Sequence, residues 1–183
     1  MALPYLTMPA FPTIAAGVPT VTVKNNTTLT LAAGSYGRVS VQDGATLKLG
    51  GGLYQFVSFD VDQGGTVLFQ AAVQLNIQTY LDADNRSNLM LDPAATGLRA
   101  SRVVIYVAGG NNGSSNNTHD SVDDGFGGPA VVNIGERAVV QANIYAPNGS
   151  IWLKSRSQAT GAFIGQHVLV GSFSRLVLDS AFF

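Results

Sequence analysis

The sequence predicts an all-β, single-domain protein: a right-handed parallel β-helix (β-solenoid) of about seven coils, with about 18–22 residues per coil. Three observations predict this fold class. The composition favours strands and tight turns over helices, a unit of two short strands recurs along the chain, and Gly, Asn or Asp turn signals separate the strands.

The composition also excludes several classes of protein. Hydrophobic residues make up 46% of the chain and charged residues only 11%, so the chain is not of the disordered type. Glutamate occurs once and lysine three times, which leaves few long helix-forming side chains. The net charge is −1 and the ten cationic side chains are scattered singly, so we expect no nucleic-acid partner. Apolar runs such as Val103–Val107 are too short for membrane insertion.

A repeated segment establishes the coil. Gly34–Val41 (GSYGRVSV) recurs 18 residues later as Gly52–Phe59 (GLYQFVSF), with four of eight positions identical. A weaker third copy ends in Leu75-Asn76-Ile77. The repeat predicts two columns of inward side chains, Val39/Val57/Leu75 and Val41/Phe59/Ile77.

The intervening strands align at a similar spacing. They are predicted at residues 28–31, 46–49 and 66–69, and give the inward columns Leu29/Leu47/Val67 and Leu31/Leu49/Phe69. Asn25-Asn26, Asp43-Gly44 and Gly64-Gly65 precede them as turn signals. Equivalent residues stacked in this way form a core that no single coil could bury alone.

The pattern continues to the end of the chain with one interruption. First strands are predicted to start at 28, 46, 66, 88, 131, 150 and 168, so one step of 43 residues stands out. Removing the polar stretch 109–129 leaves a step of 22, a normal coil. We therefore expect residues 21–183 to form the β-helix, with a loop inserted at 109–129.

Two terminal segments lie outside the repeat. Residues 1–20 carry four prolines, which predicts an extended segment or cap, and the chain ends in the apolar Phe182 and Phe183. Solenoid ends are unpaired edges, so we expect these segments either to cap them or to join subunits. Phe11, Phe182 and Phe183 are the candidate assembly contacts. The N-terminus lacks the features of a signal peptide, so an exported protein would have lost it.

Acidic residues are the candidates for chemistry. Asp60 and Asp62 share one strand face, Asp62 and Asp82 are expected to stack one coil apart, and Asp84 and Arg86 follow. Their Gly and Asn neighbours favour a role in turns, and no catalytic constellation accompanies them, so we expect no enzyme. In the inserted loop, Asp120, Asp123 and Asp124 are weak candidates for binding Ca²⁺, and no other cofactor is expected.

Aromatic side chains suggest a second kind of site. Tyr36, Tyr54 and Trp152 could line a glycan-binding face, although Tyr36 and Tyr54 are equally well explained as one stacked column.

Several phrases carry a family resemblance. They are ANIYAPNGSIWL (142–153), TGAFIG (160–165), LVLDSAF (176–182) and LAAGSY (31–36). With them the chain resembles an uncharacterised bacterial β-helical domain family, found at the C-terminal end of exported pilin-like and choice-of-anchor surface proteins. The likeness covers residues 6–182 and brings no known catalytic residues. It is also distantly similar in architecture to bactofilins, which polymerise end to end.

The resemblance implies an extracellular or cell-surface setting in a bacterium. We expect a structural module whose partner is itself, as a homo-oligomer or a filament formed by end-to-end self-assembly. A carbohydrate-binding or adhesive surface module is the alternative, and a polysaccharide lyase or hydrolase is a third interpretation.

Overall fold

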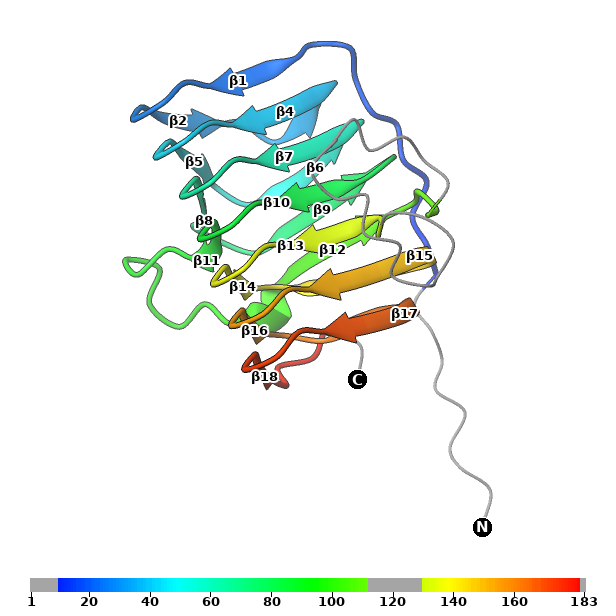
Figure 1. The fold of residues 1–183 in the computed structure, drawn as a ribbon. Helices are drawn as coiled ribbons and strands as arrows, with labels where there is room; N and C mark the ends of the chain where they lie inside the picture. Colours follow the sequence, from blue (N-terminus) through cyan, green and yellow to red (C-terminus); the bar gives the residue numbers. More distant parts are fainter. Residues whose placement is uncertain (1–9, 112–129, 182–183) are drawn as a thin grey trace.

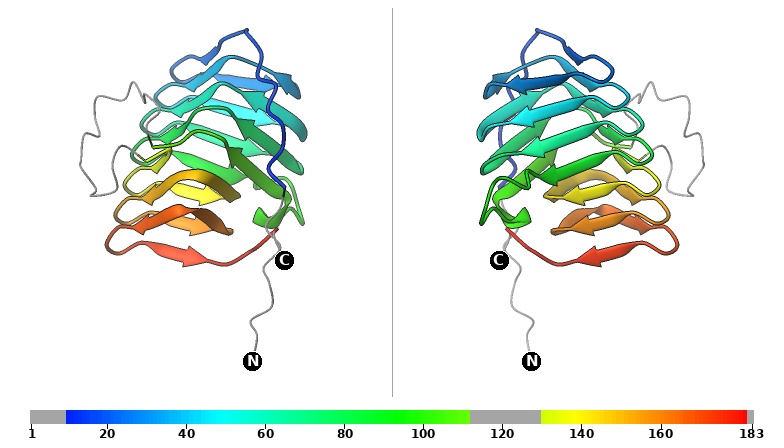
Figure 2. Two further views of the ribbon diagram at one scale, coloured as in Figure 1. Left: turned by 90° about the vertical axis from the view of Figure 1, so that its right-hand side faces the viewer. Right: turned by 90° about the vertical axis from the view of Figure 1, so that its left-hand side faces the viewer.

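The computed structural model describes residues 10–111 and 130–181 and confirms the parallel β-helix, with about seven coils stacked into a rod (Figure 1). Each coil except the last contributes one strand to each of three lateral faces, not to two as the sequence suggested. All the strand pairs are parallel, so residues of successive coils lie in columns along the rod (Figure 2).

The three faces are named A, B and C in the order in which the chain visits them. Face A holds β1 (Val21–Val23), β4 (Arg38–Val41), β7 (Ser58–Val61), β10 (Leu81–Ala83) and β13 (Val132–Ile134). Face B holds β2 (Thr28–Leu31), β5 (Thr46–Leu49), β8 (Thr66–Phe69), β11 (Asn88–Leu91), β14 (Val139–Gln141), β16 (Gln158–Thr160) and β18 (Arg175–Val177). Face C holds β3 (Gly34–Ser35), β6 (Gly52–Phe56), β9 (Val73–Ile77) and β12 (Val103–Val107). The long strands β15 (Asn143–Leu153) and β17 (Phe163–Val170) bend from face C to face A.

The predicted register is right on face B in the first four coils and wrong on the other faces. Leu29, Leu47 and Val67 pair in successive coils as expected. On face A, however, Val39 pairs with Phe59 rather than Val57, and on face C Leu75 pairs with Tyr54. The 18-residue identity therefore does not mark the stacking. Paired residues of these two coils are 18 apart on face B, where Leu31 pairs with Leu49, but 20 apart on face C, where Gly34 pairs with Tyr54. The corner between faces B and C therefore shifts the register.

The chain leaves the rod between β11 and β12. Residues 92–102 form an excursion that ends in the 3-10 helix η1 (Ala100–Arg102), which the sequence did not predict. The inserted loop predicted at 109–129 falls largely in 112–129, outside the described residues. Asn88 pairs with Val139, a step of 51 residues. The first strands predicted at 131, 150 and 168 lie on face A, not on face B.

The corner between faces A and B is the most regular feature of the rod. In every coil four residues join the two strands, and the third of them has a left-handed backbone with φ of 56–70°. In six of these turns the fourth amide donates to the first carbonyl at 2.9–3.3 Å. The third residues are Asn26, Gly44, Gly64, Arg86, Arg137, Arg156 and Phe173. We call this stack of turns the turn edge.

Inward side chains fill the rod with a continuous apolar core. Columns such as Val39–Phe59–Leu81–Val132–Ile151 on face A are fully buried. Residues 10–20, here called the N-terminal strap, have no regular secondary structure and lie along the rod (Figure 2). Gly17 donates to the carbonyl of Tyr36 at 3.0 Å, and Gly37 donates to that of Pro19 at 2.8 Å.

Candidate functional site

The predicted assembly contacts differ in their placement. Phe182 and Phe183 lie outside the described residues, as do the calcium candidates Asp120, Asp123 and Asp124. Phe11 is half-buried in the strap, where its ring lies 5.7 Å from that of Tyr106 and 5.9 Å from that of Tyr145. It therefore fastens the strap to face C of its own molecule, where Tyr106 and Tyr145 are paired.

The three aromatic residues expected on a glycan-binding face do not form one. Tyr54 is buried, and its hydroxyl donates to the carbonyl of Leu31 at 3.1 Å, so the prediction for this residue is wrong. Tyr36 does not stack on Tyr54 either, because its ring packs at 6.0 Å against that of Phe56. Trp152 lies on face A, in β15, and so on a different face from Tyr54 in β6.

The acidic residues do come together, but in a different pairing from the one expected. Asp60 on β7 lies directly opposite Asp82 on β10, rather than Asp62 opposite Asp82. In the same outward column Ser40 precedes them and Asn133 follows. The sequence carried the signal for this column, since each member is the second residue from the end of its face A strand. The misjudged register concealed it.

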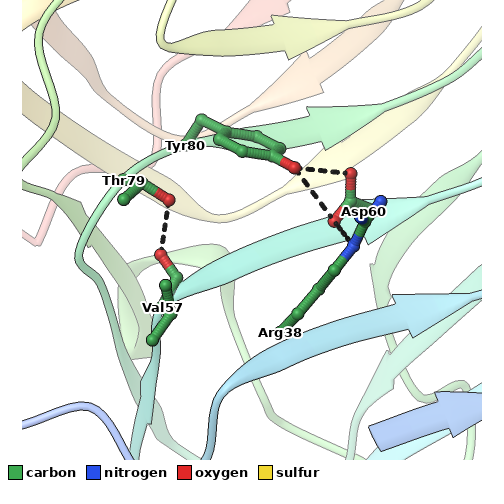
Figure 3. A network of polar contacts seen from close by, with 5 residues as sticks. All are labelled: Arg38, Val57, Asp60, Thr79 and Tyr80. Atoms are coloured by element: carbon green, nitrogen blue, oxygen red, sulfur yellow. Dashed lines mark hydrogen bonds and ion pairs between the residues drawn. The ribbon is translucent and has the colours of Figure 1, made fainter. Parts of the chain in front are cut away.

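Asp60 takes part in a polar network with the neighbouring coils (Figure 3). Arg38 Nε donates to Asp60 Oδ2 at 3.0 Å, and the hydroxyl of Tyr80 donates to Asp60 Oδ1 at 3.2 Å. Burial raises the pKa of the Asp60 carboxyl, and the cation of Arg38 offsets only part of that effect. Burial also raises the pKa of Tyr80, and the charge of Asp60 adds to this rise.

Asp82 is perturbed more strongly because it has no cation against it comparable to Arg38. Burial raises its pKa to about 6, the amide Nδ2 of Asn133 lowers it by donating to Oδ1 at 2.9 Å, and the charge of Asp60 raises it. Two adjacent carboxylates in such surroundings can share a proton near neutral pH. Both side chains are nevertheless buried, so this column has the character of a structural polar ladder more than of an open catalytic cleft.

A hollow of about 390 Å³ opens at the lower coils, where face A meets the turn edge. Trp152 and Lys154 line it together with Glu136, Ser155, Val170, Gly171 and Ser172. The ammonium of Lys154 lies 5.1 Å from the centre of the Trp152 ring, a cation–π contact. An aromatic ring beside charged and hydroxyl side chains is a suitable surface for a sugar ring.

Three arginines that look isolated in the sequence are aligned by the fold. Arg86, Arg137 and Arg156 occupy the third position of the turn edge in three successive coils. The sequence analysis described the cationic side chains as scattered singly, which is wrong for these three arginines of the turn edge. A correct register would have revealed the column, because each arginine follows a face A strand by the same number of residues.

Among the described residues, no three His, Cys, Asp or Glu side chains are grouped so as to hold a metal ion. The same part of the chain contains no helix with the length and apolar character needed to cross a membrane. Comparison with known proteins found no matching family model, no matching curated protein and no matching solved structure.

Proposed function

We propose that this protein is a structural module that assembles end to end, by stacking its last coil on the first coil of a second copy. One observation carries the proposal. Inward positions that are fully buried in the middle coils are exposed in the last coil, where Val170 is 48% and Leu176 is 45% exposed. Phe173 at the turn and Leu178 after β18 are 87% and 73% exposed. Apolar surface of this kind is stabilised when a partner covers it.

The two ends of the rod match in cross-section. The first and last coils both have a face A strand, a four-residue turn with a left-handed third residue, and a face B strand. If a second copy continues the stack, Val168 and Val170 extend the columns that begin at Val21 and Val23, and Leu176 extends the column of Leu29.

Backbone hydrogen bonding supports the same arrangement. The third turn residue donates to the second turn carbonyl of the next coil, as Arg156 does to Ser172 at 2.9 Å. In a stacked pair the amide of Phe173 would donate to the carbonyl of Asn25 in the second copy. Charges oppose such contact little, since Lys24 alone is charged in residues 21–35.

Analytical ultracentrifugation and negative-stain microscopy over a range of concentrations test self-association. We expect Leu176→Lys to abolish it, because a lysine cannot be buried against the apolar end of a second rod. Leu53→Lys is the matched control, since Leu53 is 44% exposed on face C of the second coil and so belongs to neither terminal coil. The proposal would be refuted if the wild type stayed monomeric at high concentration. It would also be refuted if both substitutions reduced self-association equally.

Cysteine cross-linking tests the polarity of the stack, because the chain has no cysteine of its own. In the proposed register Asn25 and Ser172 of two copies lie about 4.8 Å apart between Cα atoms, within disulfide range. Asn25→Cys and Ser172→Cys proteins should cross-link when mixed and not separately, and the double variant should give a ladder of covalent oligomers. Dimers of Ser172→Cys alone would indicate tail-to-tail pairing and contradict the proposal.

The cell-surface or extracellular bacterial setting of the assembly rests on the sequence resemblance. We also propose that the module is not an enzyme, and the engagement of Asp60 and Asp82 in buried hydrogen bonds supports this. Turnover of any acidic or neutral polysaccharide, lost in Asp82→Asn, would overturn that part of the proposal.

The hollow beside Trp152 favours glycan binding as a second candidate function. Apolar faces of sugar rings stack on indole rings, and Lys154, Glu136 and Ser155 supply hydrogen-bonding groups around it. A glycan array with the wild type and Trp152→Ala tests this function. We expect binding that the substitution removes; no binding above background by the wild type would count against it.

A further inference from the structure

We propose that the turn edge of the lower coils binds a linear acidic polysaccharide, through an arginine column formed by Arg86, Arg137 and Arg156. This inference rests on the glycan-binding function proposed above and names the class of glycan. It is independent of end-to-end assembly.

Backbone hydrogen bonds hold the three arginines in line. The amide of Arg86 donates to the carbonyl of Glu136 at 2.8 Å, and the amide of Arg137 donates to that of Ser155 at 3.2 Å. Each coil therefore advances the column by about 4.8 Å, the spacing of neighbouring strands. Guanidinium groups at this repeat can meet successive carboxylates or sulfates of an extended polymer that runs along the rod.

The backbone at these positions disfavours arginine. All three residues have φ of 57–62°, in the left-handed region that Gly and Asn tolerate best. The first three coils do use Asn26, Gly44 and Gly64 at the same turn position. Three arginines in a row at a strained position fit a role for their side chains, because strained residues concentrate at functional sites.

The arginine side chains are also available to a ligand. All three residues are exposed, and within the described ranges their side chains make no ion pair or hydrogen bond. Asp84 and Glu136 occupy other positions of the same turns, and Lys154 adds a cation. Four cations and two acids leave the turns of these three coils with a net charge of +2.

A polysaccharide fits this surface better than a nucleic acid does. The hollow at Trp152 adjoins the column, since Glu136 and Ser155 line it and directly precede Arg137 and Arg156 in the chain. Asp43 and Asp62 lie on the turns of the coils above, where they would repel a longer polyanion. The site thus spans about three coils, which suits a few acidic sugar residues with one ring against the indole.

Isothermal titration with polygalacturonate, neutral dextran and single-stranded DNA tests the inference on the full chain. The column variant is R86N/R137N/R156N, since asparagine removes the charge and tolerates the left-handed backbone. The matched control is R99N/R102N/R175N, which removes three exposed arginines from other parts of the rod. Circular dichroism melts establish that both variants remain folded.

We expect polygalacturonate to bind the wild type. The affinity of the column variant for it should be lower by a factor of about ten or more. The control should change affinity by no more than about threefold, and affinity should fall with added salt. Equal weakening in both variants, or none in the column variant, would refute the inference. DNA binding as tight as that of polygalacturonate would refute the class of ligand.

Trp152→Ala separates this inference from the function beneath it. If Trp152→Ala abolishes glycan binding while the column variant does not, glycan binding stands and the acidic class fails. If no polymer binds the wild type, both fail.

Discussion

Replacing Asp82 with asparagine should stabilise the protein at neutral pH. The carboxyl is buried opposite Asp60, which raises its pKa from the ordinary 3.8 to about 6. Burial therefore penalises the charged form, and the folded state binds more protons than the unfolded state between these two values. The free energy of unfolding, and with it the stability, must then fall as the pH rises from about 4 to about 6.

The size of the effect follows from the same values. A rise in pKa from 3.8 to about 6 corresponds to about 3 kcal/mol at pH 7. This is an upper figure, because the carboxyls of Asp82 and Asp60 titrate together. Asparagine keeps the oxygen that accepts from Asn133 and adds an amide that can donate to Asp60. We therefore expect Asp82→Asn to gain about 1–3 kcal/mol at pH 7 and little at pH 4.

Urea denaturation at pH 4, 5, 6 and 7 measures this directly. The wild type should lose stability across this range more steeply than the variant. Asp43→Asn is the control, since Asp43 is exposed at a turn, and should change stability by about 0.5 kcal/mol or less. The reasoning is refuted if Asp82→Asn lowers stability at pH 7 or leaves the pH dependence unchanged.

Three further predictions concern the core, the ion pair and the strap. Leu47→Ala should cost about 2–5 kcal/mol, whereas Leu29→Ala, in the same column at the open end, should cost about 1 kcal/mol; equal costs in urea denaturation would contradict the exposed end. Arg38→Met should cost about 1 kcal/mol at pH 7 and less at pH 4, because it removes the cation that lowers the pKa of Asp60; a cost independent of pH would argue against the ion pair. Phe11→Ala should release the N-terminal strap at a cost of about 1–2 kcal/mol, seen as faster amide exchange there and unchanged exchange in the central coils.

The sequence allowed the architecture to be predicted because its evidence is local. Short runs of alternating apolar residues, such as Thr46–Leu49 and Thr66–Phe69, sit between turn signals at nearly constant spacing. On face B this spacing also gave the right pairing, since the four-residue turn before each strand never changes in length. The β-helix and the face B columns of its first four coils were therefore readable without coordinates, whereas the strands expected at 131, 150 and 168 lie on face A.

The candidate sites were less predictable because they depend on the other two corners. The length of those corners varies from one residue, at Val57, to the excursion at 92–102. Nothing in the local pattern shows how long each corner is, and so which residues of two coils are paired. The repeated SYGRV and LYQFV phrases pointed to Tyr36 over Tyr54, whereas hydrogen bonding places Tyr36 beside Phe56 and buries Tyr54. The glycan-binding face was misjudged for this reason.

The sequence by itself thus determined that the chain winds into a parallel rod with an apolar interior, because strand alternation and turn chemistry act over a few residues. Only the tertiary structure decided which residues of different coils become neighbours. Asp60 meets Asp82 across 22 residues, and Arg86 aligns with Arg137 across 51, through pairings set by the whole sheet. The exposed end at Leu176 is likewise a property of the stack, since the same column is buried wherever a coil lies on both sides of it.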